Sequence, residues 1–255
     1  MPITDNGEIK FVYGSPAMAV GRGKRSAIVV GDIHIGMESK LRKLGIHLYD
    51  MSASMARDIL RIASEFGTSR AILLGDIKDQ VLRPESSERF AISNFFNILS
   101  PLDITVVRGN HDAYLSDMLS VPIVDELTTG SFSFTHGNSW PSEKAMQSKY
   151  LITAHNHAAL SIKDLNGAVY SRKAWVVAGI NPEEAHRRYH KFNKDIKLVI
   201  MPAFNDMILG HPVNEGESRG LGPLLQNRVF ETETASVYSL EGQYFGTISE
   251  LRKKQ

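Results

Sequence analysis

The sequence predicts an α/β fold. Short apolar runs rich in β-branched residues alternate with amphipathic segments, which is the pattern of strands that alternate with helices. Three of these runs lead directly into a Gly-Asp or Gly-Asn pair, at residues 31–32, 75–76 and 109–110. After residue 120 strand and turn signals follow one another closely, so we expect more β-structure in the second half.

In the first half we expect three strands and two helices in alternation. The strands are predicted at residues 26–32, 70–76 and 103–112. The first helix is predicted over residues 51–67, with Asp50 as its N-cap and Gly67 just past its end. The second is predicted over residues 84–99, entered through Pro84 and two serines.

In the second half we expect mainly hairpins. They are predicted at residues 123–137, at 159–177 with a turn at Asn166-Gly167, and at 235–251. A helix is expected to start at Asn181-Pro182, a strand at residues 197–204, and a long loop at 205–230. No internal repeat or linker interrupts the chain, so one domain over residues 1–255, without a separate capping domain, is expected.

Composition excludes several classes of protein. The chain has 255 residues, 42% of them hydrophobic, which suffices for one large core. A net charge of +1 argues against a surface that binds polyanions everywhere. Cysteine is absent, which excludes disulfides, thiolate zinc sites and thiol catalysis. No apolar run approaches the roughly 20 residues that span a bilayer. We therefore expect a cytoplasmic protein without a membrane partner.

Asp32 and His34 follow the apolar run that ends at Gly31. A buried charge is costly unless it is paired or bound to a metal. In an extended chain, residues i and i+2 point the same way, so both side chains could reach one point. These two residues alone leave two interpretations open, a salt-bridged strand end or half of a metal site.

Four further sites share this character, a carboxylate, Asn or His beside a small residue near the end of an apolar run. They are Asp76, then Asn110 with His111 and Asp112, then His136, and then His155 with His157. Each alone is explained by a turn, a cap or a strand-end histidine. Ligands in open α/β sheets bind outside the carboxyl ends of the strands, so all five sites could converge. Five of the nine histidines fall within them, which favours a metal site.

In this order the motifs resemble those of the calcineurin-like metallophosphoesterases. That family carries D-x-H, G-D-x-x-D, G-N-H-D/E, a single His and G-H-x-H, and here only Ala154 departs, at the position of the last Gly. The resemblance implies a four-layer αββα sandwich of two mixed sheets flanked by helices, the metallo-dependent phosphatase fold. Residues 198–214 also resemble the tail of archaeal SbcD-related and DNA-ligase-associated metallophosphoesterases.

The resemblance implies two divalent metal ions, manganese first, with iron or zinc as alternatives. One ion would take Asp32, His34 and His157, the other Asn110, His136 and His155, and Asp76 would bridge them. A hydroxide held between the ions would attack the phosphoester. His111 would protonate the leaving oxygen, and Asp112 would orient the imidazole and raise its pKa. Asp79 stands where related nucleases carry His, which puts SbcD-type exonuclease activity in question.

The resemblance favours DNA as the substrate, cleaved by an endonuclease-like or structure-dependent nuclease in DNA repair. Arg187, Arg188 and Lys191 lie in a basic segment that could contact DNA, with Tyr189 and Phe192 interleaved for stacking, or could form a solvated helix end. Trp140 and Tyr114 could flank a substrate groove, or simply pack. A helicase or ligase partner and a homodimer are further expectations.

Two other functions stay open at this point. The same metal site could hydrolyse a small substrate, such as a cyclic nucleotide or a phosphomonoester. The chain could also be a scaffold that binds a partner protein and catalyses little.

Overall fold

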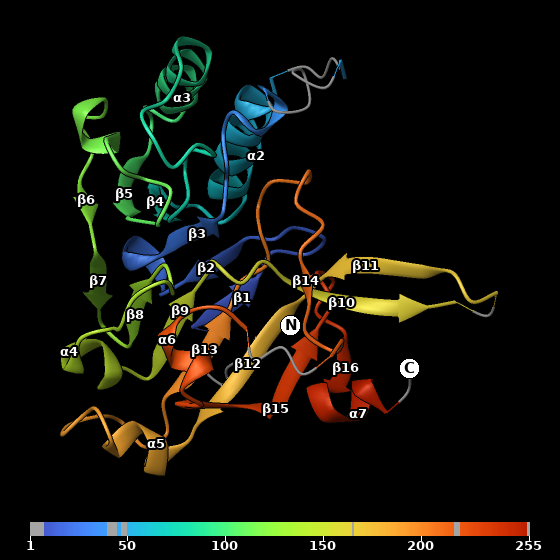
Figure 1. The fold of residues 1–255 in the computed structure, drawn as a ribbon. Coiled ribbons are helices and arrows are strands. Elements are labelled where there is room, and N and C mark those ends of the chain that lie inside the picture. The colour runs from blue at the N-terminus through green and yellow to red at the C-terminus, as the bar shows by residue number, and fades with distance from the viewer. Residues whose placement is uncertain (1–7, 40–44, 47–49, 165, 217–219, 254–255) are drawn as a thin grey trace.

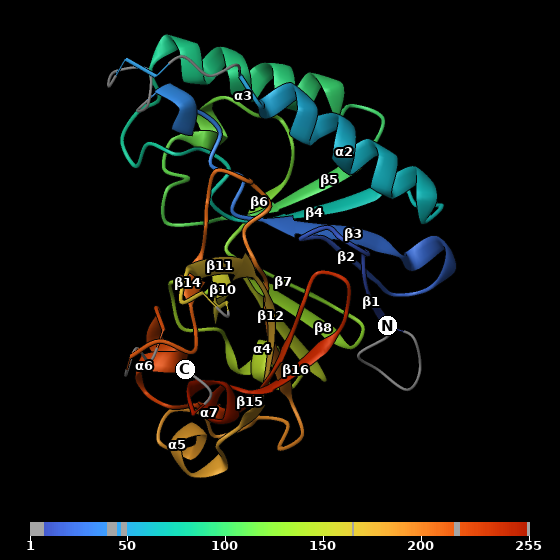
Figure 2. The same cartoon turned by 90° about the vertical axis from the view of Figure 1, so that its right-hand side faces the viewer.

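Two β-sheets packed face to face, with helices on both outer faces, form the body of the molecule (Figures 1 and 2). The structure is a computed structural model that describes residues 8–39, 45–46, 50–164, 166–216 and 220–253. Figure 2 shows α2 and α3 over one sheet and the short C-terminal helices beneath the other. The predicted α/β fold with two mixed sheets flanked by helices is confirmed.

The first sheet has six strands in the order β1-β2-β3-β4-β5-β6. They are β1 (Ile9–Phe11), β2 (Met18–Val20), β3 (Ala27–Gly31), β4 (Arg70–Leu74), β5 (Asp103–Val107) and β6 (Ile123–Val124). The first three pair antiparallel, with the 3₁₀ turn η1 (Gly23–Arg25) between β2 and β3. Strands β3 to β6 are parallel, so their carboxyl ends share one edge.

Helices α2 (Ser52–Glu65) and α3 (Ser86–Ile98) connect the parallel strands, as predicted, but their starts differ from the prediction. The N-cap of α2 is Met51, and the Asp50 carboxylate instead accepts the Ser52 amide proton at 2.8 Å. Gly67 follows the helix with φ +61, a conformation that favours glycine. The N-cap of α3 is Glu85, and the two serines begin the helix itself.

The second sheet has seven strands in the order β16-β15-β12-β13-β9-β8-β7. They are β7 (Glu126–Thr129), β8 (Phe132–Thr135), β9 (Tyr150–Thr153), β12 (Trp175–Ile180), β13 (Lys197–Ile200), β15 (Phe230–Tyr238) and β16 (Tyr244–Thr247). Strands β8, β9 and β13 are parallel, so their carboxyl ends also share an edge. The predicted first hairpin forms between β7 and β8, whereas β6 joins the first sheet.

A third, small sheet has the order β11-β10-β14. Its strands β10 (Ala158–Lys163) and β11 (Val169–Lys173) form the predicted hairpin, which projects from the body in Figure 1. The predicted loop over residues 205–230 is wrong in part, because it contains β14 (His211–Pro212) and α6 (Pro223–Gln226). The closing hairpin also ends earlier than predicted, because a capping box of Thr247 and Glu250 starts α7 (Ile248–Arg252).

Further helical segments in the described part of the chain are short, among them the 3₁₀ turn η2 (Leu115–Asp117), α4 (Glu143–Met146) and α5 (Pro182–His186). Helix α5 starts as predicted, with the Asn181 side chain accepting the amides of Glu183 and Glu184. Within the described part of the chain, no helix has the length and hydrophobicity required to cross a bilayer.

Three apolar clusters correspond to the interfaces between layers. The first joins the outer face of the first sheet to α2 and α3, the second joins the second sheet to its helices, and the third lies between the sheets. In the middle cluster, Val29 and Leu74 of the first sheet face Phe134, Ile152 and Trp175 of the second. The apolar packing of the two sheets thereby fixes the position of one set of strand ends against the other.

We expect Phe95→Ala to lower the free energy of unfolding by about 3–4 kcal/mol, because it opens a cavity in the first cluster. Phe95 is fully buried on α3, whereas Phe90 on the same helix is 73% exposed. The matched Phe90→Ala change should stay within about 0.5 kcal/mol. Urea denaturation of both variants measures the difference, and equal losses would contradict the packing described here.

Candidate metal centre

The predicted ligands come from the strand ends of both sheets. Asp32 follows β3, Asp76 follows β4 and Asn110 follows β5, while His136 follows β8 and His155 follows β9. Strands β3, β4 and β5 are parallel in the first sheet, and β8 and β9 are parallel in the second. The carboxyl ends within each sheet therefore lie together, and the two sets converge where the sheets meet.

Left-handed backbone conformations are concentrated at this place. Seven described non-glycine residues have φ in the left-handed region, and five of them are predicted ligands. These are Asp32, His34, Asp76, His155 and His157. The conformation costs an L-residue roughly 1–2 kcal/mol, and such strain gathers at functional sites. The extended-strand explanation for Asp32 and His34 is therefore wrong: β3 ends at Gly31, and a sharply turned loop directs the two side chains.

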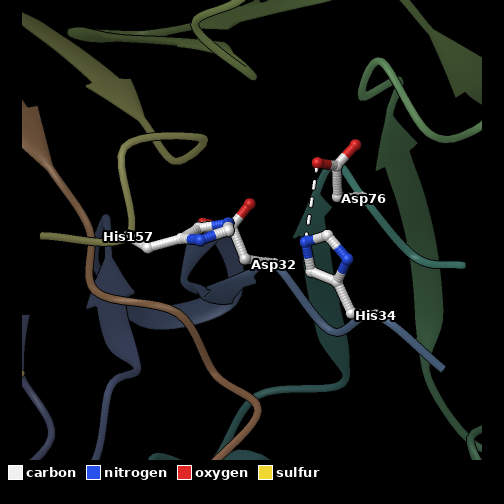
Figure 3. Close-up of side chains that lie close together, drawn as sticks. All are labelled: Asp32, His34, Asp76 and His157. Carbon is white, nitrogen blue, oxygen red and sulfur yellow. Dashed lines mark ion pairs between the residues drawn. The ribbon is translucent and has the colours of Figure 1, made fainter. Parts of the chain in front are cut away.

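One group of potential ligand atoms comprises Asp32, His34, Asp76 and His157 (Figure 3). These atoms all lie within 4.8 Å of one another. His34 Nε2 is 3.6 Å from Asp76 Oδ2, and His157 Nε2 is 3.5 Å from Asp32 Oδ2. Both Nε2 atoms are buried without a hydrogen-bond partner among the described residues. Buried nitrogen atoms in this state beside carboxylates fit a site for a divalent ion.

A second group comprises Asp76, His136 and His155. His136 Nε2 lies 3.2 Å from Asp76 Oδ2 and also 3.2 Å from Asn110 Oδ1, so the Asn110 amide belongs to the same place. Asp76 is the residue that both groups share. The seven residues predicted as ligands are thus brought together as two adjoining sets, with Asp76 in the position expected of a bridge.

The pKa values show how strongly the carboxylates act here. Burial raises the pKa of Asp76, but the hydrogen bond and charge of His136, with the His111 amide, outweigh burial and hold it below its usual range. Burial lowers the pKa of His136, yet the bond to Asp76 and the charges of Asp32 and Asp76 raise it to about 9. Burial and repulsion from His136 lower the pKa of His155 to about 4. The centre attracts positive charge, which divalent ions supply.

Two glycines permit this close packing. A Cβ on Gly75, which has φ +75, would overlap the His136 ring, and a Cβ on Gly109 would overlap the Asp76 amide and carboxylate. Glycine in the G-D and G-N pairs therefore allows the motif loops to approach each other.

His111 turns one ring nitrogen toward the site. Its Nδ1 lies 2.6 Å from the backbone carbonyl oxygen of Asp79, and a carbonyl can only accept a hydrogen bond. Nδ1 therefore carries the proton, and Nε2 lies 4.0 Å from Asp76 Oδ2. The ring is partly exposed, so a substrate can reach it.

The role predicted for Asp112 is not the one that the structure shows. Asp112 is fully buried, and its carboxylate accepts the amides of Ile77 and Gly109, both at 2.8 Å. It ties the loop after β4 to the loop after β5, and the Asp79 carbonyl orients His111 instead. The Asp79 carboxylate lies 3.4 Å from His34 Nδ1, which leaves Nε2 of His34 for a metal.

Asn205 is a site residue that the sequence did not reveal. It is fully buried, and its Nδ2 donates to the carbonyls of Ile33 at 2.9 Å and His34 at 3.4 Å. It lies in the segment after β13 that crosses to the β3 loop, where the Phe204 amide donates to Gly31. In the sequence, only the resemblance of residues 198–214 to a nuclease tail pointed to this segment. That resemblance did not indicate which backbone groups the Asn205 side chain would contact.

Asn205→Ala should lower the free energy of unfolding by about 1–3 kcal/mol, because it leaves buried carbonyls of the ligand loop unpaired. We expect metal affinity to fall roughly 10- to 100-fold, as for other residues that orient ligands. Thermal unfolding and metal titration would measure both effects. The control is Asn97→Ala on exposed α3 surface, and metal affinity equal to that of this control would contradict the positioning role.

The three residues predicted to bind substrate do not act as a unit. The Arg187 guanidinium pairs with Glu184 at 3.3 Å on the exposed end of α5. Lys191 is exposed, and its backbone amide donates to Glu143. Arg188 differs, because its guanidinium lies over the Trp140 ring, 4.2 Å from the ring centroid. Trp140 lines a surface groove that also includes His155, so only Arg188 is linked to the metal centre.

The aromatic residues of the basic segment are not free for stacking. Tyr189 is buried and donates its hydroxyl to the Pro141 carbonyl at 3.0 Å, and Phe192 packs against His186 and the second cluster. Tyr114, the other predicted groove residue, is 44% exposed, with the Arg83 guanidinium 5.0 Å from its ring centroid.

Comparison with known proteins supports a phosphoesterase. The family model described as calcineurin-like phosphoesterase matches residues 26–231. A nuclease MPE from Pseudomonas putida has a similar structure, with a TM-score of 0.62, 16% sequence identity, and coverage of 96% of this chain and 99% of that chain. Yfce, a phosphoesterase from E. coli, matches with a TM-score of 0.42 and 13% identity over 86% of this chain and 96% of its own. Among curated proteins, no sequence matches this chain significantly.

Proposed function

The chain belongs to the calcineurin-like phosphoesterase family and is a metal-dependent phosphoesterase, and on this premise we propose that it is a two-metal phosphodiesterase that cleaves DNA. The observation that carries the proposal is the pair of ligand groups that share Asp76. A shared carboxylate between two sets of imidazole and oxygen ligands is what a pair of borderline divalent ions requires. We infer manganese as the ion from the resemblance of the motifs.

The residues present can be assigned to the two ions. Asp32, His34 and His157 would hold one and Asn110, His136 and His155 the other, with Asp76 common to both. Two ions so held would generate a nucleophile from water at neutral pH and neutralise charge on the phosphoryl oxygens. With the Nδ1 proton held by the Asp79 carbonyl, His111 in its doubly protonated form would give the Nε2 proton to the leaving oxygen and keep the proton on Nδ1.

DNA as the substrate has separate support. The similarly folded protein from Pseudomonas putida is a nuclease. Trp140 shares a surface groove with His155, and the Arg188 guanidinium lies over its ring. An aromatic ring and a cation are groups that bind nucleic acid strands. We infer an endonuclease-like role in DNA repair, related to the archaeal SbcD-related and ligase-associated enzymes. In that role the protein would be cytoplasmic, would act beside a helicase or ligase, and would form a homodimer.

One observation favours a small phosphodiester or phosphomonoester instead. The positive charge of Arg187 is already paired with Glu184, and the net charge of the chain is only +1, so the chain as a whole has little net attraction for a long polyanion.

Hydrolysis of three substrates in manganese tests the proposal. They are an end-labelled single-stranded DNA, a 2′,3′-cyclic nucleotide and an aryl phosphodiester, with Asp76→Asn as the control for contaminating enzymes. We expect the wild type alone to cut the DNA. Turnover of only the small esters would replace the DNA proposal with the second candidate. Inactivity on all three, with metal demonstrably bound, would favour a partner-binding scaffold.

A further inference from the structure

A groove on the surface runs beside the metal centre. Its walls include His155 together with Asn138, Trp140, Leu221, Pro223 and Gln226. Because His155 is one of the residues grouped with Asp76 and His136, a substrate with its phosphorus at the metal centre can extend its neighbouring moiety into this groove. The chemistry of the groove therefore bears on what that moiety is.

Trp140 is held firmly in the groove wall. Part of its indole packs against the second apolar cluster, and its ring meets Tyr189 edge-on, with the centroids 6.2 Å apart. Tyr189 is itself fixed by its hydroxyl bond to Pro141. The Arg188 guanidinium lies over the ring, 4.2 Å from its centroid, and the indole is only half-buried. The part of the ring that lines the groove is therefore a preorganised flat surface beside a positive charge.

The groups that line the groove, together with Arg188 on the Trp140 ring, suit a neutral, hydrogen-bonding ligand that adjoins a negative charge. Asn138 and Gln226 are exposed amides that can both donate and accept, and no carboxylate is among the described residues that line the groove. Arg188 lies over the Trp140 ring and adds a positive charge at that place. A flat aromatic surface, amides and a guanidinium together match a nucleobase with its adjoining phosphate.

We propose that this groove binds a nucleobase of single-stranded DNA, which stacks against Trp140 while Arg188 attracts the adjoining phosphate. The inference rests on the proposed function, because it assumes that the strand in the groove is the one whose phosphodiester occupies the metal centre. It also narrows the class of DNA substrate. A base within a duplex is stacked on its neighbours and cannot enter the groove unless it is first released from the stack. Single strands, frayed ends and loops are then the preferred substrates.

Tryptophan fluorescence tests the contact directly. The chain has two tryptophans, and Trp175 is fully buried and stacked on Phe11, with centroids 4.1 Å apart. A change of emission on ligand binding therefore reports Trp140. His111→Asn protein loaded with manganese would be titrated with a short single-stranded oligonucleotide and with an abasic oligonucleotide of the same length. We expect quenching by the first that the second does not produce.

Affinity measurements on variants add a second test. Trp140→Ala should weaken binding roughly 5- to 150-fold, the range found for loss of one stacked base, and Trp140→Phe should restore most of it. Arg188→Ala should lower the slope of log affinity against log salt by about one. The matched control, Arg61→Ala, removes an exposed arginine of α2 that pairs with Glu65, and should change neither quantity.

The outcomes separate the two proposals. Cleavage and tight binding of DNA, with equal affinity for the abasic strand and unchanged Trp140 emission, would overturn the nucleobase site and leave the nuclease standing. DNA that is neither bound nor cut, while small esters are hydrolysed, would overturn both. The abasic comparison uses unchanged groove residues, so it decides the matter even if Trp140→Ala fails to fold.

Discussion

Asp76→Asn is expected to abolish hydrolysis and to remove both metal ions. Asp76 is the residue common to the two ligand groups, and the substitution replaces its shared anionic oxygen with a neutral amide of the same shape. The Asn side chain can still accept the His111 amide, which now bonds Asp76 Oδ1 at 2.9 Å. The loop should therefore keep its conformation while the electrostatic basis of the site is lost.

Activity on an aryl phosphodiester should fall by more than about 10³-fold, the scale on which loss of electrostatic stabilisation acts. A readout independent of activity is the stabilisation of the folded protein by metal. Manganese at a hundred times its dissociation constant should stabilise the wild type by about 2.7 kcal/mol and the variant hardly at all. Metal analysis after gel filtration and thermal unfolding with and without manganese measure this.

The control for Asp76→Asn is Asp125→Asn, at an exposed carboxylate that pairs with Arg108 at 3.1 Å. This change should leave metal content and activity at wild-type values. Retention of both metal ions by Asp76→Asn would contradict the shared position of Asp76, whatever happens to the rate.

His111→Asn is expected to slow cleavage of DNA by roughly 10²–10⁴-fold, as for removal of a positioned general acid. Metal content should stay unchanged: His111 lies near His34 and Asp79 in a third group of possible ligands, but its Nδ1 is engaged by the Asp79 carbonyl and it is not among the residues assigned to the two ions. The reason for the loss is specific: the leaving oxygen of DNA is strongly basic and needs a proton, and Nε2 is the nitrogen that faces the site.

This explanation can be separated from general damage to the site by changing the leaving group. A nitrophenyl ester leaves as a weak base and gains little from a general acid, so its hydrolysis should fall far less than that of DNA. Rates of both substrates in the same preparation provide the measurement. Equal losses on the two esters would show that His111 acts in some other way.

Much of the fold and the set of candidate ligands could be predicted from local patterns. A buried parallel strand is a short apolar run, and the residues that follow it lie at a sheet edge, so Asp32, Asp76 and Asn110 were found without coordinates. The order of the motifs added the three histidines from the second sheet. Short elements were missed: α7 and β14 have five and two residues, too few to show a period.

Partnerships between distant segments were decided by the tertiary structure alone. Asp112 was expected to orient His111 because the two are adjacent in the sequence, but its carboxylate reaches amides across the sheet edge, and the carbonyl of Asp79 meets the ring. Asn205 supports the backbone of His34 from 171 positions away. Similarly, Arg188 contacts the ring of Trp140, which lines the groove that includes His155.

The physical reason for this division is the range of the forces involved. Hydrophobic periodicity and strand-end chemistry are properties of neighbouring residues, and so the sequence by itself determined the strands, the α/β class and the kinds of ligand. A hydrogen bond depends on positions within a few tenths of an ångström, which are set here by the packing of one sheet on the other. Only that packing decided which group orients His111, which amide supports the ligand loop, and which arginine lies over Trp140.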